Sequence, residues 1–319
     1  MKTKLLLTLP LLALMVTGCD LKDRLGGDTY TIGICQLLTH EALDAATQGF
    51  MDAVKEQLGA DKVKFDLQNA ANDSANCVTI ANSFVSKNVD LIMANATPAL
   101  QAAYASTETI PILGTSITEY GVALNIPDFD GVVGGNVSGT SDLAPLSEQA
   151  QMIVDVFPSA HNIGLLYCSG EPNSLYQVQV VEQELQAKGL TTKRMSFSDS
   201  NDIVTVLNGN IDSVDALYIP TDNTAASCKE TIHNVCGPKN KPVVAGEEGI
   251  CSGCGAVTLS ISYYNLGVKT GKMAAEILKG EKDISTMPIA YDENPVKKYN
   301  PTICAELGLT PPEGYVAIG

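Results

Sequence analysis

The chain has 319 residues, of which 45% are hydrophobic and 18% are charged. This is the composition of a globular protein long enough for two domains of roughly 150 residues each. Its 36 acidic and 20 basic residues give a formal net charge of −16. Nucleic-acid binding needs a basic surface, and the sequence contains no cluster of Lys and Arg, so a nucleic-acid partner is excluded.

The start of the chain predicts a lipoprotein signal peptide. Lys2 and Lys4 precede an apolar run, 5–15, that is shorter than the roughly 20 residues of a permanent transmembrane helix. The run is followed at 16–19 by the letters VTGC, which resemble a bacterial lipobox, where the cysteine becomes lipidated. We expect a signal peptide at 1–18, a lipid on Cys19 and a polar tether at 19–28. The alternative is a plain signal peptide cut elsewhere.

The next part of the chain alternates between strand and helix patterns. The segment 41–59 has Leu43, Ala46, Phe50 and Val54 at helical spacing and ends in a glycine. The apolar, β-branched runs between helices predict strands. In chain order we expect strand 30–37, helix 41–59, strand 62–70, helix 74–88, strand 89–96, helix 98–106 with Pro98 at its first position, and strand 110–117. This order predicts a parallel sheet covered by helices on both faces.

The segment 119–146 breaks the alternation with many glycines and prolines and is interpreted as a crossing between two halves. The alternation then restarts. The second half predicts helix 146–158, strand 162–168, helix 174–189, strand 191–198, helix 201–210, strand 216–220, helix 223–237, strands 242–246 and 256–262, and helix 265–280.

Two such halves predict an α/β fold of two doubly wound parallel-sheet lobes joined by a hinge. We expect the chain to return late to its first half. The first lobe is predicted to contain 29–140 plus 263–286, and the second lobe 141–262 plus 287–319.

Eight cysteines follow Cys19, and their spacing gives no disulfide framework. Cys228 and Cys236 are expected on one helix, about 12 Å apart along its axis, which is too far for a bridge. Cys251 and Cys254 have the spacing of a redox motif, but acidic neighbours would raise the thiol pKa. The three histidines are scattered, so no metal site is expected. Structural or incidental cysteines are the preferred interpretation.

Three segments share one pattern, in which an apolar strand passes through short polar residues into a helix. They are 91–103, 164–177 and 217–227, and Thr115 and Ser116 end a fourth strand. In open parallel sheets, ligands bind beyond the carboxyl ends of the strands. Helix starts there offer unpaired N–H groups that suit an anion such as a carboxylate, although the same side chains could simply cap the helices.

The scarcity of arginine narrows the chemistry of this expected cleft. After the leader only Arg24, in the tether, and Arg194, at the wrong end of its strand, remain, so an arginine clamp on a carboxylate is not expected. Asp222, Glu247 and Glu248 follow later strands and could meet a ligand cation. A zwitterion with an apolar side chain fits this set. The absence of Trp weakens a sugar interpretation.

Seven segments of the sequence resemble those of a known protein family. The segments QLLTHEALDAATQGF, NATPALQAA, GGNVSGTSD, IGLLYCSGEPNS, YIPTDNT, AGEEG and ISYYNLGVKTGKMAAEILKG resemble the tryptophan/tyrosine-binding lipoproteins of ABC transporters, in order, over about residues 30–310. The resemblance implies a periplasmic binding protein type I, or Venus-flytrap, fold. It implies capture of an aromatic amino acid for an ABC permease, no catalysis, no cofactor and no metal. The protein would be a monomer anchored to the outer face of the cytoplasmic membrane.

The resemblance also implies a set of ligand-binding positions. They are Gln36, Ala96, Thr97, Thr115, Ser116, Ser169, Glu171, Asn173, Ser174, Thr221, Asp222, Asn223, Glu247, Glu248 and Tyr264. Thr97, Ser116, Ser174 and Thr221 would hold a carboxylate, Asp222 or Glu248 would meet an ammonium, and Tyr264 would line the side-chain pocket. Ser262, where many relatives have Asp, and the CSGC segment depart from the family pattern.

Other functions remain open on the sequence. The same fold could bind a sugar, a nucleoside or a branched amino acid, or the protein could be a surface adhesin or sensor. A third interpretation of the function is a redox lipoprotein that uses Cys251 and Cys254. A two-lobed repressor is disfavoured because a lipobox stands where a DNA-binding helix pair would be.

Overall fold

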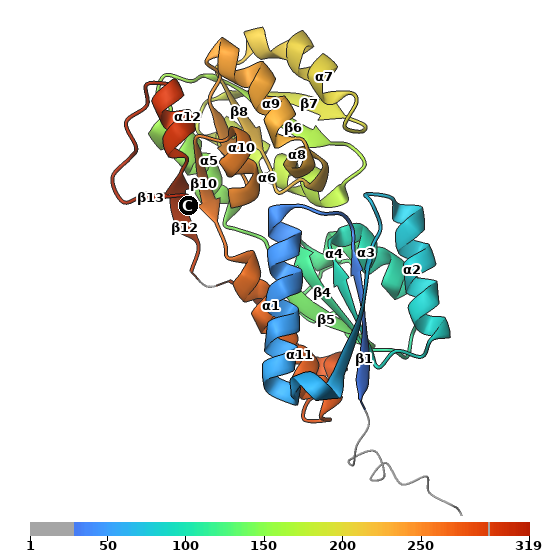
Figure 1. The fold of residues 1–319 in the computed structure, drawn as a ribbon. Coiled ribbons are helices and arrows are strands. Elements are labelled where there is room, and N and C mark those ends of the chain that lie inside the picture. The colour runs from blue at the N-terminus through green and yellow to red at the C-terminus, as the bar shows by residue number, and fades with distance from the viewer. Residues whose placement is uncertain (1–28, 293) are drawn as a thin grey trace, which may run out of the picture.

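The computed structural model describes residues 29–292 and 294–319. The signal peptide, the lipidated Cys19 and the tether therefore lie outside the described residues. Within the described part, the chain forms two lobes, each built on its own β-sheet (Figure 1). No helix in these residues is both long and apolar enough to span a bilayer.

The first lobe is built on a parallel sheet with the strand order β11-β5-β4-β3-β1-β2. Its strands are β1 (Tyr30–Gln36), β2 (Val63–Asn69), β3 (Leu91–Asn95), β4 (Ile112–Ile117), β5 (Val137–Ser141) and β11 (Ala290–Tyr291). Its helices are α1 (Glu41–Leu58), α2 (Ser74–Ser86), α3 (Thr97–Ser106), α4 (Tyr120–Leu124) and α11 (Tyr263–Leu278). Short 3-10 turns lie at Ala60–Lys62 and Ile284–Thr286.

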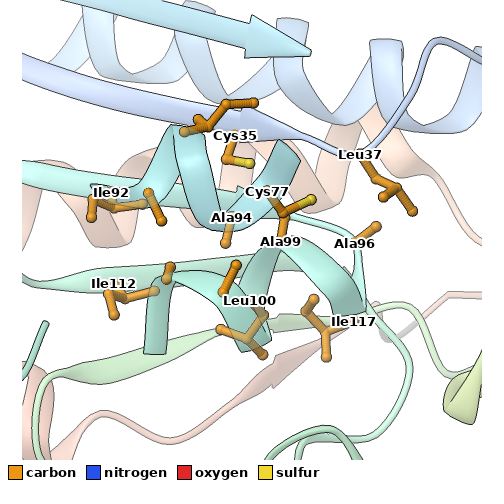
Figure 2. Close-up of a cluster of buried hydrophobic side chains, with 14 of the residues drawn as sticks. Cys35, Leu37, Cys77, Ile92, Ala94, Ala96, Ala99, Leu100, Ile112 and Ile117 are labelled. Atoms are coloured by element: carbon orange, nitrogen blue, oxygen red, sulfur yellow. The ribbon is translucent and has the colours of Figure 1, made fainter. Parts of the chain in front are cut away.

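Helices cover both faces of this sheet, as a parallel sheet requires. α1 and α11 bury Phe50, Val54 and Met273 against one face. α2 and α3 cover the other face, where Cys35 of β1 and Cys77 of α2 lie in one apolar cluster (Figure 2). The near-continuous burial of β3 and β4 explains their unbroken apolar sequence.

The second lobe has the strand order β13-β12-β10-β9-β8-β6-β7, in which only β12 against β10 is antiparallel among the pairs described. Its strands are β6 (Asn162–Cys168), β7 (Thr191–Phe197), β8 (Ala216–Ile219), β9 (Val243–Ala245), β10 (Val257–Ser260), β12 (Val296–Tyr299) and β13 (Val316–Ala317). Its helices are α5 (Leu146–Val156), α6 (Pro172–Ala187), α7 (Ile203–Asn210), α8 (Asn223–Ser227), α9 (Lys229–Cys236), α10 (Glu248–Cys254) and α12 (Pro301–Glu306), with 3-10 turns at Ile211–Ser213 and Gly237–Lys239.

The chain passes between the lobes three times, between β5 and α5, between β10 and α11, and between β11 and β12. The first crossing is therefore only 142–145, and most of the Gly-rich segment 119–146 belongs to the first lobe. Gly131, Gly134 and Gly135 have positive φ there and form turns before β5. β11 pairs with β5, so the first sheet extends past the predicted limit at 286.

Three further details differ from the sequence-based expectation. The helix expected at 223–237 is two helices, α8 and α9, that meet at Cys228. Pro98 is the second residue of α3 rather than its first. The strands β9 and β10, expected to follow one another directly, are separated by α10. Since β9 and β10 are parallel, a crossover between them is required.

Candidate ligand-binding site between the lobes

A narrow cavity lies between the two lobes, at the carboxyl ends of their strands. Its cavity volume is about 10 Å³. That is close to the minimum for one water, so a ligand can enter only when the lobes separate. The cavity is lined by His40, Leu43, Ser116, Thr118, Asp142, Asn173, Thr221, Asp222, Asn223, Ala226, Glu247 and Tyr263.

The first lobe meets this cavity with a strained backbone. Ser116, at the end of β4, has φ 55°, and Ala96, just before α3, has φ 88° and ψ 156°. The conformation of Ala96 is essentially restricted to glycine, and such residues cost of order 1–3 kcal/mol. Strain of this kind is concentrated at functional sites, where surrounding structure holds it in place. Here it lies at two neighbouring strand ends, beside the start of α3.

The second lobe meets the cavity with a hydrogen-bonded network around Glu171. Its Oε1 accepts from the backbone N–H and the hydroxyl of Thr224, at 2.9 and 2.8 Å. Its Oε2 accepts from the backbone N–H and side-chain amide of Asn223, at 3.0 and 2.8 Å, and from Asn173 at 3.2 Å. Glu171 therefore fixes the start of α8 and has little capacity left for a ligand.

Asp222 and Glu247 are buried N-cap residues. Asp222 accepts from the backbone N–H groups of Ala225 and Cys168, at 2.8 and 2.7 Å, one on each oxygen. Glu247 likewise accepts from the N–H groups of Gly249 and Ile250. Burial raises the pKa of Glu247 to about 7, and burial with the nearby Glu171 raises that of Asp222. Both carboxyls therefore use both of their oxygens on backbone N–H groups.

Asp142 is the third buried acid in the cavity. It follows β5, is 3% exposed, and its Oδ2 accepts from the Tyr263 hydroxyl at 2.8 Å. Burial raises its pKa to about 6, opposed by Tyr263 and by the nearby Thr118 hydroxyl. Thr118 is thus close to the carboxyl, but Oδ1 has no hydrogen bond with acceptable geometry in the described structure. Asp142 consequently keeps one oxygen for another partner.

Unpaired polar atoms gather in this cavity. Six buried side-chain atoms lack a hydrogen-bond partner among the described residues, and four of them belong to cavity residues. These four are His40 Nδ1, Ser116 Oγ, Asp142 Oδ1 and Asn173 Oδ1. Because buried polar groups are nearly always paired, such a concentration indicates a place where a polar ligand completes the bonding.

Direct contacts hold the lobes together across the cavity. His40 Nε2 lies 3.4 Å from Asn223 Oδ1, and Asn72 donates to Thr224 Oγ1 at 3.4 Å. Glu41 of α1 accepts from Lys229 Nζ at 2.7 Å and from the Ser252 hydroxyl at 3.1 Å. The structure therefore represents the lobes in a closed arrangement.

Six of the expected ligand-binding residues line the cavity. They are Ser116, Asn173, Thr221, Asp222, Asn223 and Glu247. Ala96, Thr97, Thr115, Glu171 and Ser174 lie buried at the same strand ends and helix starts, outside the cavity lining. Thr115 bonds to Thr140 at 3.2 Å within the sheet.

The other expected residues are engaged elsewhere. Gln36 binds the Leu38 carbonyl, Asp44 and Thr47, and Ser169 donates to the Phe197 carbonyl. Glu248 forms an ion pair with Lys298 at 2.5 Å. Tyr264 is 43% exposed, and its hydroxyl reaches Asp52 on α1, while the preceding Tyr263 faces the cavity.

Sequence reasoning missed His40, Leu43, Thr118, Asp142 and Ala226 as cavity residues, and it chose Tyr264 in place of Tyr263. Asp142 directly follows β5, and His40 lies in the short loop between β1 and α1, so the rule that ligands bind at the carboxyl ends of strands could have found both. The choice of Tyr263 over Tyr264 depends on the rotation of α11 about its axis. That rotation is fixed by close packing on α1, where a Cβ at Gly267 would lie 2.0 Å from the Ala46 carbonyl oxygen.

The cysteines do not form a reactive centre. All eight described cysteines are free thiols. Cys251 and Cys254 lie in α10, donate to the carbonyls of Gly255 and Ile250, and have pKa values raised chiefly by burial. Thiol–disulfide chemistry needs an accessible thiolate, so this environment opposes the redox interpretation. Within residues 29–292 and 294–319 no cluster of potential metal ligands occurs.

Comparison with known proteins identifies the family. A family model described as ABC transporter substrate binding protein matches residues 31–317. The "Tyrosine-binding protein" of Clostridioides difficile (strain R20291) is 33% identical over 287 residues, which cover 86% of this chain and 83% of that protein. The ABC domain from Streptococcus pneumoniae in complex with L-Trp has a TM-score of 0.87 at 30% identity, covering 91% of this chain and all of the other.

A second solved structure shows which conformation is present here. The ligand-free, open structure of CD0873, a substrate binding protein with adhesive properties from Clostridium difficile, has a TM-score of 0.70 at 33% identity, covering 91% of this chain and 99% of that one. The L-Trp complex fits better despite its slightly lower identity, which agrees with the closed contacts described above. A leucine binding protein of Thermotoga maritima, 12% identical with a TM-score of 0.59, shares the fold alone.

These comparisons confirm the two-lobed fold of periplasmic binding protein type I and the family inferred from the sequence motifs. Proteins of this family bind a solute and are not enzymes. The chain belongs to the ABC transporter substrate-binding proteins.

Proposed function

We propose that this protein captures an aromatic amino acid outside the cytoplasm and delivers it to an ABC permease. The observation that carries the proposal is the cavity between the lobes, where an acid with an unpaired oxygen and an unpaired hydroxyl face the same space. An amino acid zwitterion offers the complementary pair of charges. The names of two relatives mention tyrosine and L-Trp, which supports an aromatic side chain.

The carboxylate of the ligand is assigned to the first lobe. Ser116 has an unpaired hydroxyl in the cavity, and the start of α3, at Thr97, lies beside it in the sheet order. A helix N-terminus attracts an anion through its free N–H groups and its dipole. Thr221 and Ser174 would contribute from the second lobe, as the family resemblance implies.

A thermal-shift screen tests this function. The protein is unfolded and refolded to remove any carried ligand, then heated with each amino acid, several sugars and several nucleosides. A ligand at about 100 times its dissociation constant adds about 2.7 kcal/mol of stability. We expect a shift of several degrees with Tyr, Phe or Trp. A response to sugars or nucleosides alone would contradict the aromatic assignment and leave the family intact.

The proposal includes a lipid anchor on Cys19 that holds a monomer at the outer face of the cytoplasmic membrane. Its support is the signal sequence and lipobox pattern. Labelling cells with a fatty acid should mark the wild-type protein and leave the Cys19→Ala variant unlabelled and detached from membranes. A Cys19→Ala variant that still carries label would contradict the anchor.

A further inference from the structure

The acid at the first crossing has an unusual position relative to the hinge. Asp142 is the first residue after β5, within the crossing to α5, and its backbone N–H bonds to the Ile117 carbonyl at 3.1 Å. Tyr263 begins α11 immediately after the second crossing. The 2.8 Å bond between their side chains therefore joins two of the three segments that connect the lobes.

The remaining oxygen of Asp142, a residue of the cavity lining, has no charge partner there. Oδ1 is unpaired, the side chain is buried, and no Lys or Arg belongs to the residues described as lining the cavity. The other acids of the site differ, since Asp222 and Glu247 each use both oxygens on backbone N–H groups. Among these acids only Asp142 has an oxygen available for a cation.

The neighbouring unpaired atoms are also acceptors. Burial lowers the pKa of His40 and so favours the neutral ring, and its Nε2 lies 3.4 Å from the acceptor Asn223 Oδ1, so Nε2 carries the proton and Nδ1 accepts. Asn173 Nδ2 donates to Glu171, Ser174 and the Thr221 carbonyl, which leaves Oδ1 as an acceptor. The cavity thus presents three unpaired acceptors, and a primary ammonium has three N–H donors to match them.

We propose that Asp142 receives the primary ammonium of the ligand, with His40 and Asn173 as further acceptors, and that its bond to Tyr263 ties the bound ligand to two crossings of the hinge. This inference rests on the proposed function, because it assumes an amino acid ligand. It identifies Asp142 as a determinant of specificity and explains how ligand binding favours the closed lobes. A ligand that bridges Asp142 and the second-lobe Asn173 contacts both sides of the cleft.

The experiment compares two ligands on two proteins by calorimetric titration of the full chain. The ligands are the aromatic amino acid that binds best in the screen and its deaminated analogue, the 3-arylpropionate, which keeps the ring and the carboxylate. The protein variant is Asp142→Asn, which has the same shape, can still accept from Tyr263, and turns a donor group toward the cavity. We expect the wild type to prefer the amino acid, and the variant to lose roughly 30-fold or more in affinity for the amino acid alone.

A contrasting variant separates recognition from general damage. Asp222→Asn weakens a helix cap in the same cavity, so it should unfold at a lower temperature and weaken both ligands by similar factors. If Asp142→Asn also weakens both ligands alike, Asp142 is a structural residue and the inference is overturned. If the wild type binds no aromatic amino acid, the proposed function itself has failed, which is a distinguishable result.

Tyr263→Phe tests the link to the hinge. It removes the hydroxyl that contacts Asp142 and leaves the carboxylate in place. We expect the preference for the amino acid to persist, and the contraction on ligand binding, measured as the radius of gyration by X-ray scattering, to decrease. An unchanged contraction would overturn the link between ligand and hinge.

Discussion

The two sides of the cavity use their polar side chains differently. On the second lobe, Glu171, Asp222 and Glu247 are almost entirely consumed by internal hydrogen bonds. On the first lobe and its crossing, Ser116 and Asp142 keep unpaired atoms. A buried polar side chain in this cavity is therefore not necessarily a ligand contact, because its polar atoms can all be paired within the protein. The second lobe provides a rigid wall on which Asn173 Oδ1 is the unpaired atom, and the first lobe with the crossing provides further groups that a ligand completes.

The largest effect is expected from removing Glu171, which tests whether the second lobe forms a rigid wall. The Glu171→Ala variant leaves the backbone and side-chain donors of Asn223 and Thr224 without their acceptor in a largely buried place, so we expect the free energy of unfolding to fall by about 3 kcal/mol or more. Urea denaturation measures the change. The matched control is Glu182→Ala on the same helix α6, which loses a surface ion pair with Arg194 and should cost less than about 1 kcal/mol. Equal losses in the two variants would contradict the rigid-wall description.

The pH dependence of stability tests whether the carboxyl of Asp142 is uncompensated in the ligand-free protein. Its pKa in the folded protein is about 6, against an ordinary value of 3.8. The protonated form is favoured by folding, so its stabilising contribution is present below about pH 4 and is lost as the pH rises through 6. Relative to Asp142→Asn, the ligand-free wild type should lose up to about 3 kcal/mol between pH 4 and pH 8.

Urea titrations of both proteins at several pH values measure this difference. Taking the difference between wild type and variant removes the contribution of the other acids. A saturating amino acid ligand should reduce the loss, because an ammonium compensates the carboxylate. A difference that does not vary with pH would show that Asp142 is already compensated in the ligand-free protein.

The Ser116→Ala variant tests whether an unpaired side chain contributes to ligand affinity and not to stability. Because its hydroxyl has no partner among the described residues, Ser116→Ala removes no internal hydrogen bond. Stability should therefore change by less than about 0.5 kcal/mol. Affinity for the amino acid should fall by roughly tenfold or more, the value of a hydrogen bond to a charged group. A Ser116→Ala variant with wild-type affinity in calorimetry would remove Ser116 from the ligand site.

Much of the fold was predictable from local patterns, and the exceptions have physical reasons. Alternating apolar runs and amphipathic segments predicted most of the parallel strands of the two sheets, because buried strands and one-sided helices impose those patterns. Helix α10 was missed since its sequence, EGICSGC, is rich in glycine and short. It forms because Glu247 caps it and because the parallel pair β9 and β10 needs a crossover.

The site was predictable in position and only partly in chemistry. The rule for strand ends located Ser116, Asn173 and Asp222, which line the cavity. It could not tell Asp222 from Asp142 as the partner of a cation. That distinction depends on which backbone N–H groups surround each carboxylate, and they come from segments distant in sequence, such as Cys168 for Asp222. Only the folded chain determines which acid retains an unpaired oxygen.

The smallest expected effect concerns the contacts that close the lobes at the cavity rim. Lys229 of the second lobe pairs with Glu41 of the first at 2.7 Å, but the Glu41 side chain is 63% exposed. An exposed pair contributes at most about 1 kcal/mol and weakens with salt. Lys229→Met should therefore raise the ligand dissociation rate by roughly two- to fivefold in low salt, with little effect in high salt, as stopped-flow fluorescence can measure.

The control is Lys239→Met, which breaks a similar pair with Asp212 inside the second lobe and should leave dissociation unchanged. If both variants released the ligand equally fast, closure would depend on the buried contacts of the cavity and not on its charged rim.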